Sequence, residues 1–136
     1  MNRVVVSTNM KIHYGSRLVE SGSTLSSEQT RAHPQWTIPS DDGGWWTLVM
    51  VDPDTTPPSF IHWMVVNMSG SRSEHVVEYE PPAHTMGVRR YAFYWLRQNG
   101  PVSISSSQDR RWFSVHAFAK KYGMTLVSRI VWWVNW

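Results

Sequence analysis

Two short apolar segments separated by an acidic, proline-rich turn constrain this chain of 136 residues more than any other feature. Residues 46–51 read WTLVMV and residues 60–68 read FIHWMVVNM, and both segments are apolar at almost every position. Continuous apolar runs of this length are typical of central strands that are covered on both faces. We therefore predict two neighbouring buried strands, joined by DPDTTPPS at residues 52–59.

The connecting turn places two polar side chains at one end of the predicted sheet. Its prolines disfavour helix and cannot donate hydrogen bonds to a sheet ladder, so Asp52 is expected at the end of the first strand. His62 is expected near the start of the second strand, on the same face as Met64 and Val66 if the alternation holds. Asp52 and Asp54 are close enough to form a carboxylate pair, but a turn with Asx hydrogen bonds explains both more simply.

Further along the chain, the pattern predicts more strands and one helix. The helix is expected to start at an Asp109 N-cap and to end at Gly123, with apolar residues at three- and four-residue spacing: Trp112, Val115, Phe118 or Ala119, and Tyr122. Residues 15–44 are expected to be mostly loop, with a tight turn at the DDGG of 41–44. The predicted strands are VVV at 4–6, an edge strand at 10–14, QWTI at 35–38, one brief strand within 71–87, RYAFYWL at 90–96, MTLV at 124–127 and IVWWVNW at 130–136.

Three stretches of the sequence resemble the phosphatidylethanolamine-binding protein family. The DPD turn followed by the His-to-VVNM strand is similar to the family's first signature, and PPAHTMGVRRYAFYWLRQ at 81–98 is similar to its second. RRWFSVHAFAKKYGM at 110–124 resembles the helix that follows. The resemblance implies a single mainly β domain over residues 1–136, with a large central antiparallel sheet, a smaller second sheet and one packed C-terminal helix. Family members usually continue into a helix that partly covers the ligand site, and this chain stops at Trp136, so we expect that helix to be absent.

The resemblance also implies a pocket for phosphate or a similar small anion. This chain departs from the family pattern twice, because Arg89 stands where the family usually has His and Glu80 stands where it usually has Gly. The residues that correspond to the family's pocket are Asp52, His62, Pro81, Pro82, Arg89 and Tyr91.

The two departures have opposite physical consequences. Arg89 keeps a positive charge and either binds phosphate bidentately or pairs with Asp52 and fills the hole. The carboxylate of Glu80 at the rim would repel phosphate. In such a site a protonated His62 donates to phosphate oxygens, and Asp52 orients the imidazole.

The charges are divided unevenly along the chain. Residues 1–84 carry five basic and nine acidic residues, a net charge of −4, whereas residues 85–136 carry eight basic residues and Asp109, a net charge of +7. One interpretation is an anionic partner such as RNA, and the other is that the charges of the two halves interleave on one surface. The residues expected to contact RNA or an acidic partner are Arg89, Arg90, Arg110, Arg111, Lys120 and Lys121.

Several functional classes have no support in the sequence. The chain has no Cys, which excludes disulfides and thiolate metal sites. Its histidines show no metal-ligand spacing, and no phosphate-binding loop or nucleophile elbow is present. No apolar run is long enough to span a membrane, and neither a signal peptide nor a transit peptide is apparent. We therefore predict a protein that is not an enzyme and has no metal and no cofactor.

Two functions follow as hypotheses. The first is a PEBP-like interaction module that serves as a structural subunit of a larger assembly of protein and RNA. A similar domain is a component of the mitochondrial ribosome's large subunit, so this hypothesis implies a mitochondrial location. The nine Trp residues agree with it, because Trp is favoured at interfaces. The alternative is a soluble regulatory protein, cytoplasmic in location, that binds a phospholipid head group or another phosphate-containing ligand in the Asp52–His62 pocket.

Overall fold

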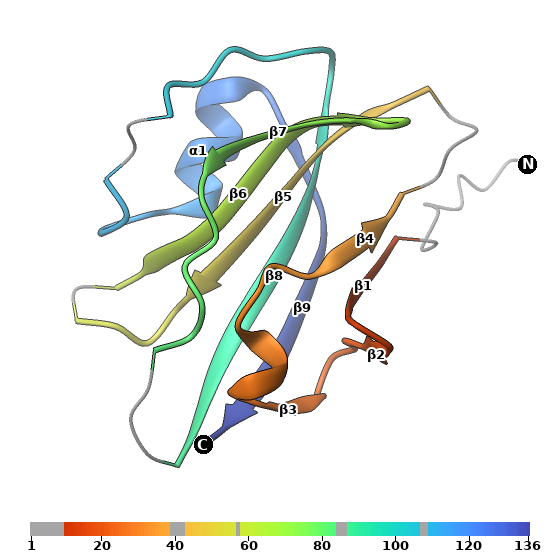
Figure 1. Ribbon diagram of the computed structural model, residues 1–136. Coiled ribbons are helices and arrows are strands. Elements are labelled where there is room, and N and C mark those ends of the chain that lie inside the picture. Colours follow the sequence, from red (N-terminus) through yellow and green to blue (C-terminus); the bar gives the residue numbers. More distant parts are fainter. Residues whose placement is uncertain (1–9, 39–42, 57, 84–86, 107–108) are drawn as a thin grey trace, which may run out of the picture.

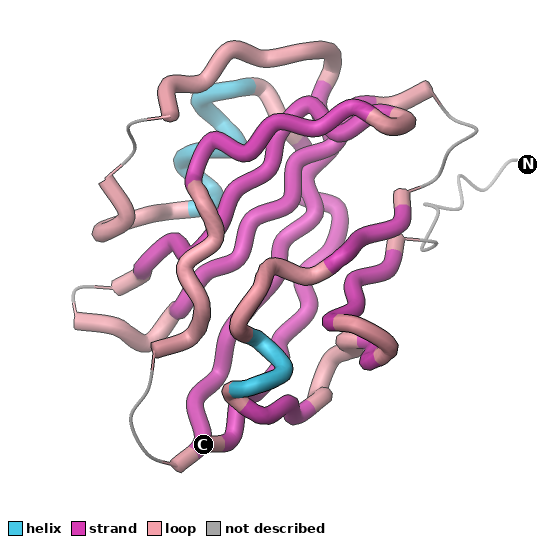
Figure 2. Tube along the Cα trace, viewed as in Figure 1, coloured by secondary structure: helices cyan, strands magenta, loops and turns pink. Residues whose placement is uncertain are grey.

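The computed structural model describes residues 10–38, 43–56, 58–83, 87–106 and 109–136 (Figure 1). In this part of the chain the structure is mainly β, as expected, and Figure 2 shows how strands dominate the trace. The elements are β1 (Lys11–Tyr14), β2 (Arg17–Leu18), β3 (Thr24–Ser26), the 3-10 helix η1 (Glu28–Thr30), β4 (Gln35–Thr37), β5 (Trp45–Asp52), β6 (Phe60–Ser69), β7 (Arg72–Val77), β8 (Val88–Gln98), α1 (Val115–Tyr122) and β9 (Thr125–Asn135).

The strands form one large and one small sheet. The six-stranded sheet has the order β3-β9-β8-β5-β6-β7, and the three-stranded sheet has the order β2-β1-β4. Neighbouring strands are antiparallel except β3, which pairs in parallel with β9. The expected large and small sheets are therefore confirmed, but the large sheet is mixed at one edge because β3 and β9 run in the same direction.

Side-chain alternation along β5 builds a core on each face of the large sheet. Leu48 and Met50 belong to one core, which the small sheet covers with Ile12. Val49 belongs to the other core, which α1 covers with Phe118. Figure 1 shows α1 and the small sheet on opposite sides of the large sheet. The continuous apolar run of β5 is explained by this arrangement, because a strand covered on both faces has no solvent side.

The strand β6 is interrupted by a bulge at His62 and Trp63. Met50 of β5 pairs with Trp63, and the next residue, Val51, pairs with Ile61, so His62 is the extra residue. A bulge of this kind changes the direction of a side chain, and bulges are frequent next to functional sites. The expectation that His62 shares a face with Met64 is therefore wrong: Met64 lies in the core under α1, whereas His62 packs ring to ring with Tyr91 of the opposite core.

The helix α1 begins later than the sequence pattern predicts. Its N-cap is Ser114, whose hydroxyl accepts a hydrogen bond from the backbone N–H of Ala117 at 3.2 Å. Asp109 instead accepts the backbone N–H of Arg111, which closes a local turn outside the helix. The predicted Asp109 cap is thus wrong, and Trp112 lies before the helix. The predicted end is confirmed, since Gly123 closes α1 in a left-handed conformation.

We expect Ser114→Ala to lower the free energy of unfolding by about 1 kcal/mol, because the replacement leaves the N–H of Ala117 without its partner. Asp109→Ala is the matched control and should cost less than about 0.5 kcal/mol, since Asp109 is exposed and caps no helix. Urea unfolding followed by circular dichroism measures both. Equal losses in the two variants would contradict the Ser114 cap.

The other predicted strands are placed as follows. The strand at 10–14 is β1, with Ile12 and Tyr14 buried on one face, and QWTI is β4. The expectation of an edge strand at 10–14 is wrong, because β1 pairs with β2 on one side and with β4 on the other. Residues 90–96 lie within β8, and the brief strand within 71–87 is β7. The two strands predicted at 124–127 and 130–136 form the single strand β9. The VVV at 4–6 and part of the predicted DDGG turn lie outside the described residues.

Candidate anion-binding site

A cavity of about 290 Å³ lies where β5 ends and where β6 and β8 begin. The pairing of Asp52 with Phe60, and of Val51 with Ala92, brings these strand ends to one edge of the large sheet. We call this space the anion cavity. It is lined by Asp52, Thr55, Phe60, His62, Glu80, Ala83, Arg89 and Tyr91.

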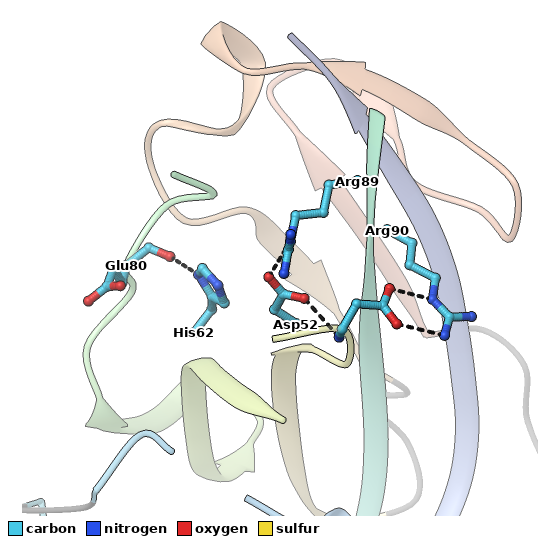
Figure 3. A network of polar contacts seen from close by, with 6 residues as sticks. Asp52, His62, Glu80, Arg89 and Arg90 are labelled. Atoms are coloured by element: carbon cyan, nitrogen blue, oxygen red, sulfur yellow. Dashed lines mark hydrogen bonds and ion pairs between the residues drawn. The ribbon is translucent and has the colours of Figure 1, made fainter. Parts of the chain in front are cut away.

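Asp52 and Arg89 form an ion pair at the cavity, as Figure 3 shows. Nε of Arg89 donates to Oδ2 of Asp52 at 2.6 Å, and the Asp52 side chain is buried whereas the Arg89 side chain is 38% exposed. Oδ1 of Asp52 accepts the backbone N–H of Asp54 at 3.0 Å, which is the expected Asx turn. Nε is the Arg89 atom that this ion pair engages.

His62 is held by the backbone and by two aromatic rings. Its Nδ1 lies 2.6 Å from the carbonyl oxygen of Glu80, and because a carbonyl only accepts, Nδ1 carries the proton (Figure 3). The neutral ring therefore has its lone pair on Nε2. Phe60 and Tyr91 contact the imidazole edge to face, with ring centroids 5.1 Å and 5.4 Å away. Burial among these groups lowers the pKa of His62, and the Glu80 carbonyl and Asp52 oppose this effect in part.

The lowered pKa of His62 predicts a pH-dependent stability. An unfolded His titrates near pH 6.5, so below about this pH the unfolded chain binds more protons than the folded chain. The contribution of His62 to stability is fully present above this pH and is lost as the pH falls toward the lower folded-state pKa. Urea unfolding between about pH 7.5 and about pH 5 measures this loss. His62→Gln should reduce the pH dependence, and an unchanged slope in that variant would contradict the assignment.

Tyr91 supplies a neutral phenol at the cavity. Burial, and then the nearby Asp52 carboxylate, raise the pKa of Tyr91 well above its ordinary value. The hydroxyl therefore keeps its proton at physiological pH and can donate a hydrogen bond to an anion.

The segment 80–83 contributes differently from the expectation. Pro81 is exposed and Pro82 is buried, and it is their neighbours Glu80 and Ala83 that line the cavity. The Glu80 carboxylate lies 3.8 Å from Nε of Arg110, so its charge is partly balanced. Glu80 acts on His62 through its backbone carbonyl, a role that a side-chain argument does not find.

Sequence reasoning missed three lining residues, Thr55, Phe60 and Ala83. Phe60 stands two residues before His62, and in an alternating strand this spacing would have been a signal for a shared site. Thr55 lies in the DPDTTPPS turn, where no pattern distinguishes it from its neighbours.

The basic residues of the second half are largely engaged within the protein. Arg90 binds Asp54 through Nε and Nη2, at 2.7 Å and 2.9 Å. Arg110 donates to the carbonyl oxygens of Ile61, His62 and Glu78. Together with Arg89–Asp52 and Arg110–Glu80, these contacts join bases of the second half to groups of the first. This favours the interpretation in which the charges of the two halves interleave.

The remaining three residues expected to contact RNA lie elsewhere. Arg111 pairs with its neighbour Asp109 at 3.3 Å, and Lys120 and Lys121 are exposed in the last turn of α1. Contact of this set with RNA remains a prediction.

Within the described ranges, no three His, Asp or Glu side chains are grouped closely enough to hold a metal ion. The same residues include no helix that is sufficiently long and apolar to cross a bilayer.

Comparisons with known proteins place the chain in a family, although no family model matches it. Protein FLOWERING LOCUS T of Arabidopsis thaliana is 32% identical over 131 residues, covering 88% of this chain and 75% of that protein. A solved structure of a phosphatidylethanolamine-binding protein from Plasmodium vivax has the same fold, with a TM-score of 0.71 and 17% identity over 93% of this chain and 84% of that one. The chain belongs to the phosphatidylethanolamine-binding protein family.

Two further comparisons agree with this assignment. Protein MOTHER of FT and TFL1 homolog 2 of Oryza sativa subsp. japonica is 31% identical over 140 residues, covering 93% of this chain and 80% of that protein. A carboxypeptidase Y inhibitor, solved in complex with its cognate proteinase, has a TM-score of 0.76 and 24% identity over 93% of this chain and 82% of that one. None of these four proteins is named as a ribosomal protein, so they give no support to the ribosomal hypothesis.

Proposed function

We propose that this chain is a non-enzymatic regulatory protein of the phosphatidylethanolamine-binding protein family that binds a phosphate-bearing small ligand or head group in the anion cavity. The observation that carries the proposal is the Arg89 guanidinium. Asp52 holds it through Nε and leaves both Nη groups for phosphate oxygens. This arrangement compensates for the His that the family usually has at this position.

The balance of charge around the cavity favours a singly charged anion. Asp52 and Arg89 cancel, Glu80 and Arg110 lie 3.8 Å apart, and the lowered pKa of His62 favours the neutral imidazole. A ligand therefore meets hydrogen-bond donors on Arg89 and Tyr91 without a large net positive field. The bare Nε2 of His62 accepts a hydrogen bond from the P–OH group of a phosphate monoanion, or takes up a proton from solvent when a dianion binds. Either route makes binding tighter at lower pH.

Asp52 supports a binding role over a catalytic one. It is the natural general base of this site, but Arg89 and the N–H of Asp54 already occupy its two oxygens. A carboxylate that is held in this way orients its partners and is a poor acceptor for a substrate proton.

Isothermal titration of the full chain with inorganic phosphate and with phosphorylethanolamine tests the proposal. We expect millimolar or tighter binding that strengthens by up to about tenfold per pH unit between about pH 7.5 and about pH 6. In the His62→Gln variant, the affinity should keep only the pH dependence that comes from the titration of the ligand itself. Absence of binding at millimolar ligand at both pH values would refute the proposal.

Docking to a protein partner is a second candidate function. It retains the interaction-module hypothesis without the ribosome, and it is supported by the carboxypeptidase Y inhibitor, which was solved with its cognate proteinase. A density gradient of native extract at low and high salt, with and without ribonuclease, tests it. Migration with a large particle that resists ribonuclease supports a protein partner, and migration near the chain mass of 15.8 kDa contradicts a stable assembly.

A further inference from the structure

Trp112 is held out to solvent by a firmly attached loop. Its side chain is 69% exposed, and its backbone has φ 60°, a left-handed conformation that bulky residues rarely adopt. The neighbouring residues attach this loop to the start of β6. The N–H of Ile61 donates to the carbonyl of Arg110 at 2.8 Å, and the N–H of Phe113 donates to the carbonyl of Ser59 at 3.0 Å. The hydroxyl of Ser59 returns a hydrogen bond to the Phe113 carbonyl at 2.7 Å.

A hollow of about 220 Å³ lies between this loop and α1. Four aromatic side chains line it, and the rings of three are in contact: Phe113 and Phe118 have centroids 5.6 Å apart, and Phe118 and Tyr122 have centroids 5.0 Å apart. Trp112 is the fourth. A space of this size accommodates one large apolar side chain, and none of its lining residues lines the anion cavity.

Positive charge surrounds the hollow. Arg111 and Lys121 line it, and Lys120 is exposed beside them in the last turn of α1. The ammonium of Lys121 lies 5.3 Å from the centroid of the Tyr122 ring. Asp109 is the acidic residue of the lining and pairs with Arg111 at 3.3 Å, so the two lysines leave an excess of positive charge. We call Arg111, Trp112, Phe113, Phe118, Lys121 and Tyr122 the Trp112 surface.

We infer that the Trp112 surface binds a protein segment that carries one large apolar side chain next to acidic residues. The hollow receives the apolar side chain, Trp112 covers it, and Lys120 and Lys121 attract the acidic residues. In protein interfaces, Trp residues and well-packed pockets often contribute most of the binding free energy, and a site that is rigid before binding loses less entropy. A hollow lined by four aromatic side chains fits one inserted side chain of a protein partner. The inference does not depend on the anion cavity.

Selection of random peptides displayed on phage against the immobilised full chain tests the inference. We expect enrichment of sequences in which an aromatic or long aliphatic residue lies beside Asp or Glu. Fluorescence anisotropy of the enriched peptides then compares variants. Trp112→Asn should weaken binding about tenfold or more, because a central Trp is lost. Lys121→Gln should weaken it about threefold and reduce its dependence on salt.

Two controls separate docking from damage to the fold. Asn accepts the left-handed conformation, so Trp112→Asn should unfold at the same temperature as the unmodified chain or a higher one. Trp133→Thr removes another exposed Trp, on β9, and should leave peptide binding unchanged. Failure to enrich acidic peptides, or equal binding by the Trp112→Asn variant, would overturn the inference. Trp112-dependent sedimentation with phosphatidylserine vesicles, without enriched peptides, would make this surface a membrane contact and would also overturn it.

Discussion

Replacing Gln98 by Leu is expected to lower the free energy of unfolding by about 3–5 kcal/mol. The Gln98 side chain is 3% exposed and joins three segments. Its Oε1 accepts the Thr47 hydroxyl at 2.7 Å and the Asn67 N–H at 2.9 Å, and its Nε2 donates to Asn67 Oδ1 and the Gly100 carbonyl, both at 2.9 Å. Leu fills a similar volume but leaves these groups buried without partners. Urea unfolding followed by Trp fluorescence measures the loss.

A double mutant isolates the cause of this loss. Thr47→Val removes the hydroxyl that Gln98→Leu leaves without a partner, so the double variant should be about 1 kcal/mol more stable than the sum of the single effects predicts. Additive effects, or a loss below about 1 kcal/mol for Gln98→Leu, would show that the network contributes little.

Replacing Arg89 by Gln is expected to weaken phosphate binding about 30-fold, which corresponds to about 2 kcal/mol for charge-assisted hydrogen bonds. The expectation rests on the proposed function. The titration with inorganic phosphate near pH 6 measures it, and the fold should persist because the Arg89 side chain is 38% exposed.

Arg90→Gln is the matched control for this experiment. Arg90 neighbours Arg89 on β8, carries the same charge and pairs with Asp54, but it does not line the cavity. Its replacement should change phosphate affinity by less than about threefold. Equal losses in the Arg89 and Arg90 variants would mean that phosphate responds to the general charge of this edge, and the specific site would be refuted.

The network around Asn67 and Gln98 marks a limit of prediction from sequence. Asn67 stands in a segment that the sequence correctly predicts as a buried strand, β6, whereas Gln98 is the last residue of β8 and lies two residues beyond the strand predicted at 90–96. Asn67 has φ 55°, and its side chain joins β6 to the loop at Val102, while Gln98 closes the network from β8. The presence of Asn or Gln in a sequence does not indicate such a role, because the role depends on a hydrogen bond between residues that are 31 positions apart.

The helix start illustrates a different limit. Asp109 and Ser114 are both good N-cap residues, so local chemistry alone allows either. The backbone of Arg110 and Phe113 is hydrogen-bonded to the start of β6, which fixes residues 110–113 in a turn beside that strand. The helix can therefore begin only after this contact ends, and Ser114 becomes the cap.

The sequence by itself determined the two buried strands β5 and β6, the turn that places Asp52 at their end, the mainly β structure and the resemblance to the family. These features depend on continuous apolar runs and on proline, whose effects are local. Only the tertiary structure decided that a bulge turns His62 toward Tyr91, that Arg89 pairs with Asp52 through Nε, and that Glu80 acts through its carbonyl. Each of these depends on which atoms of distant segments meet, and residue type and spacing do not specify that.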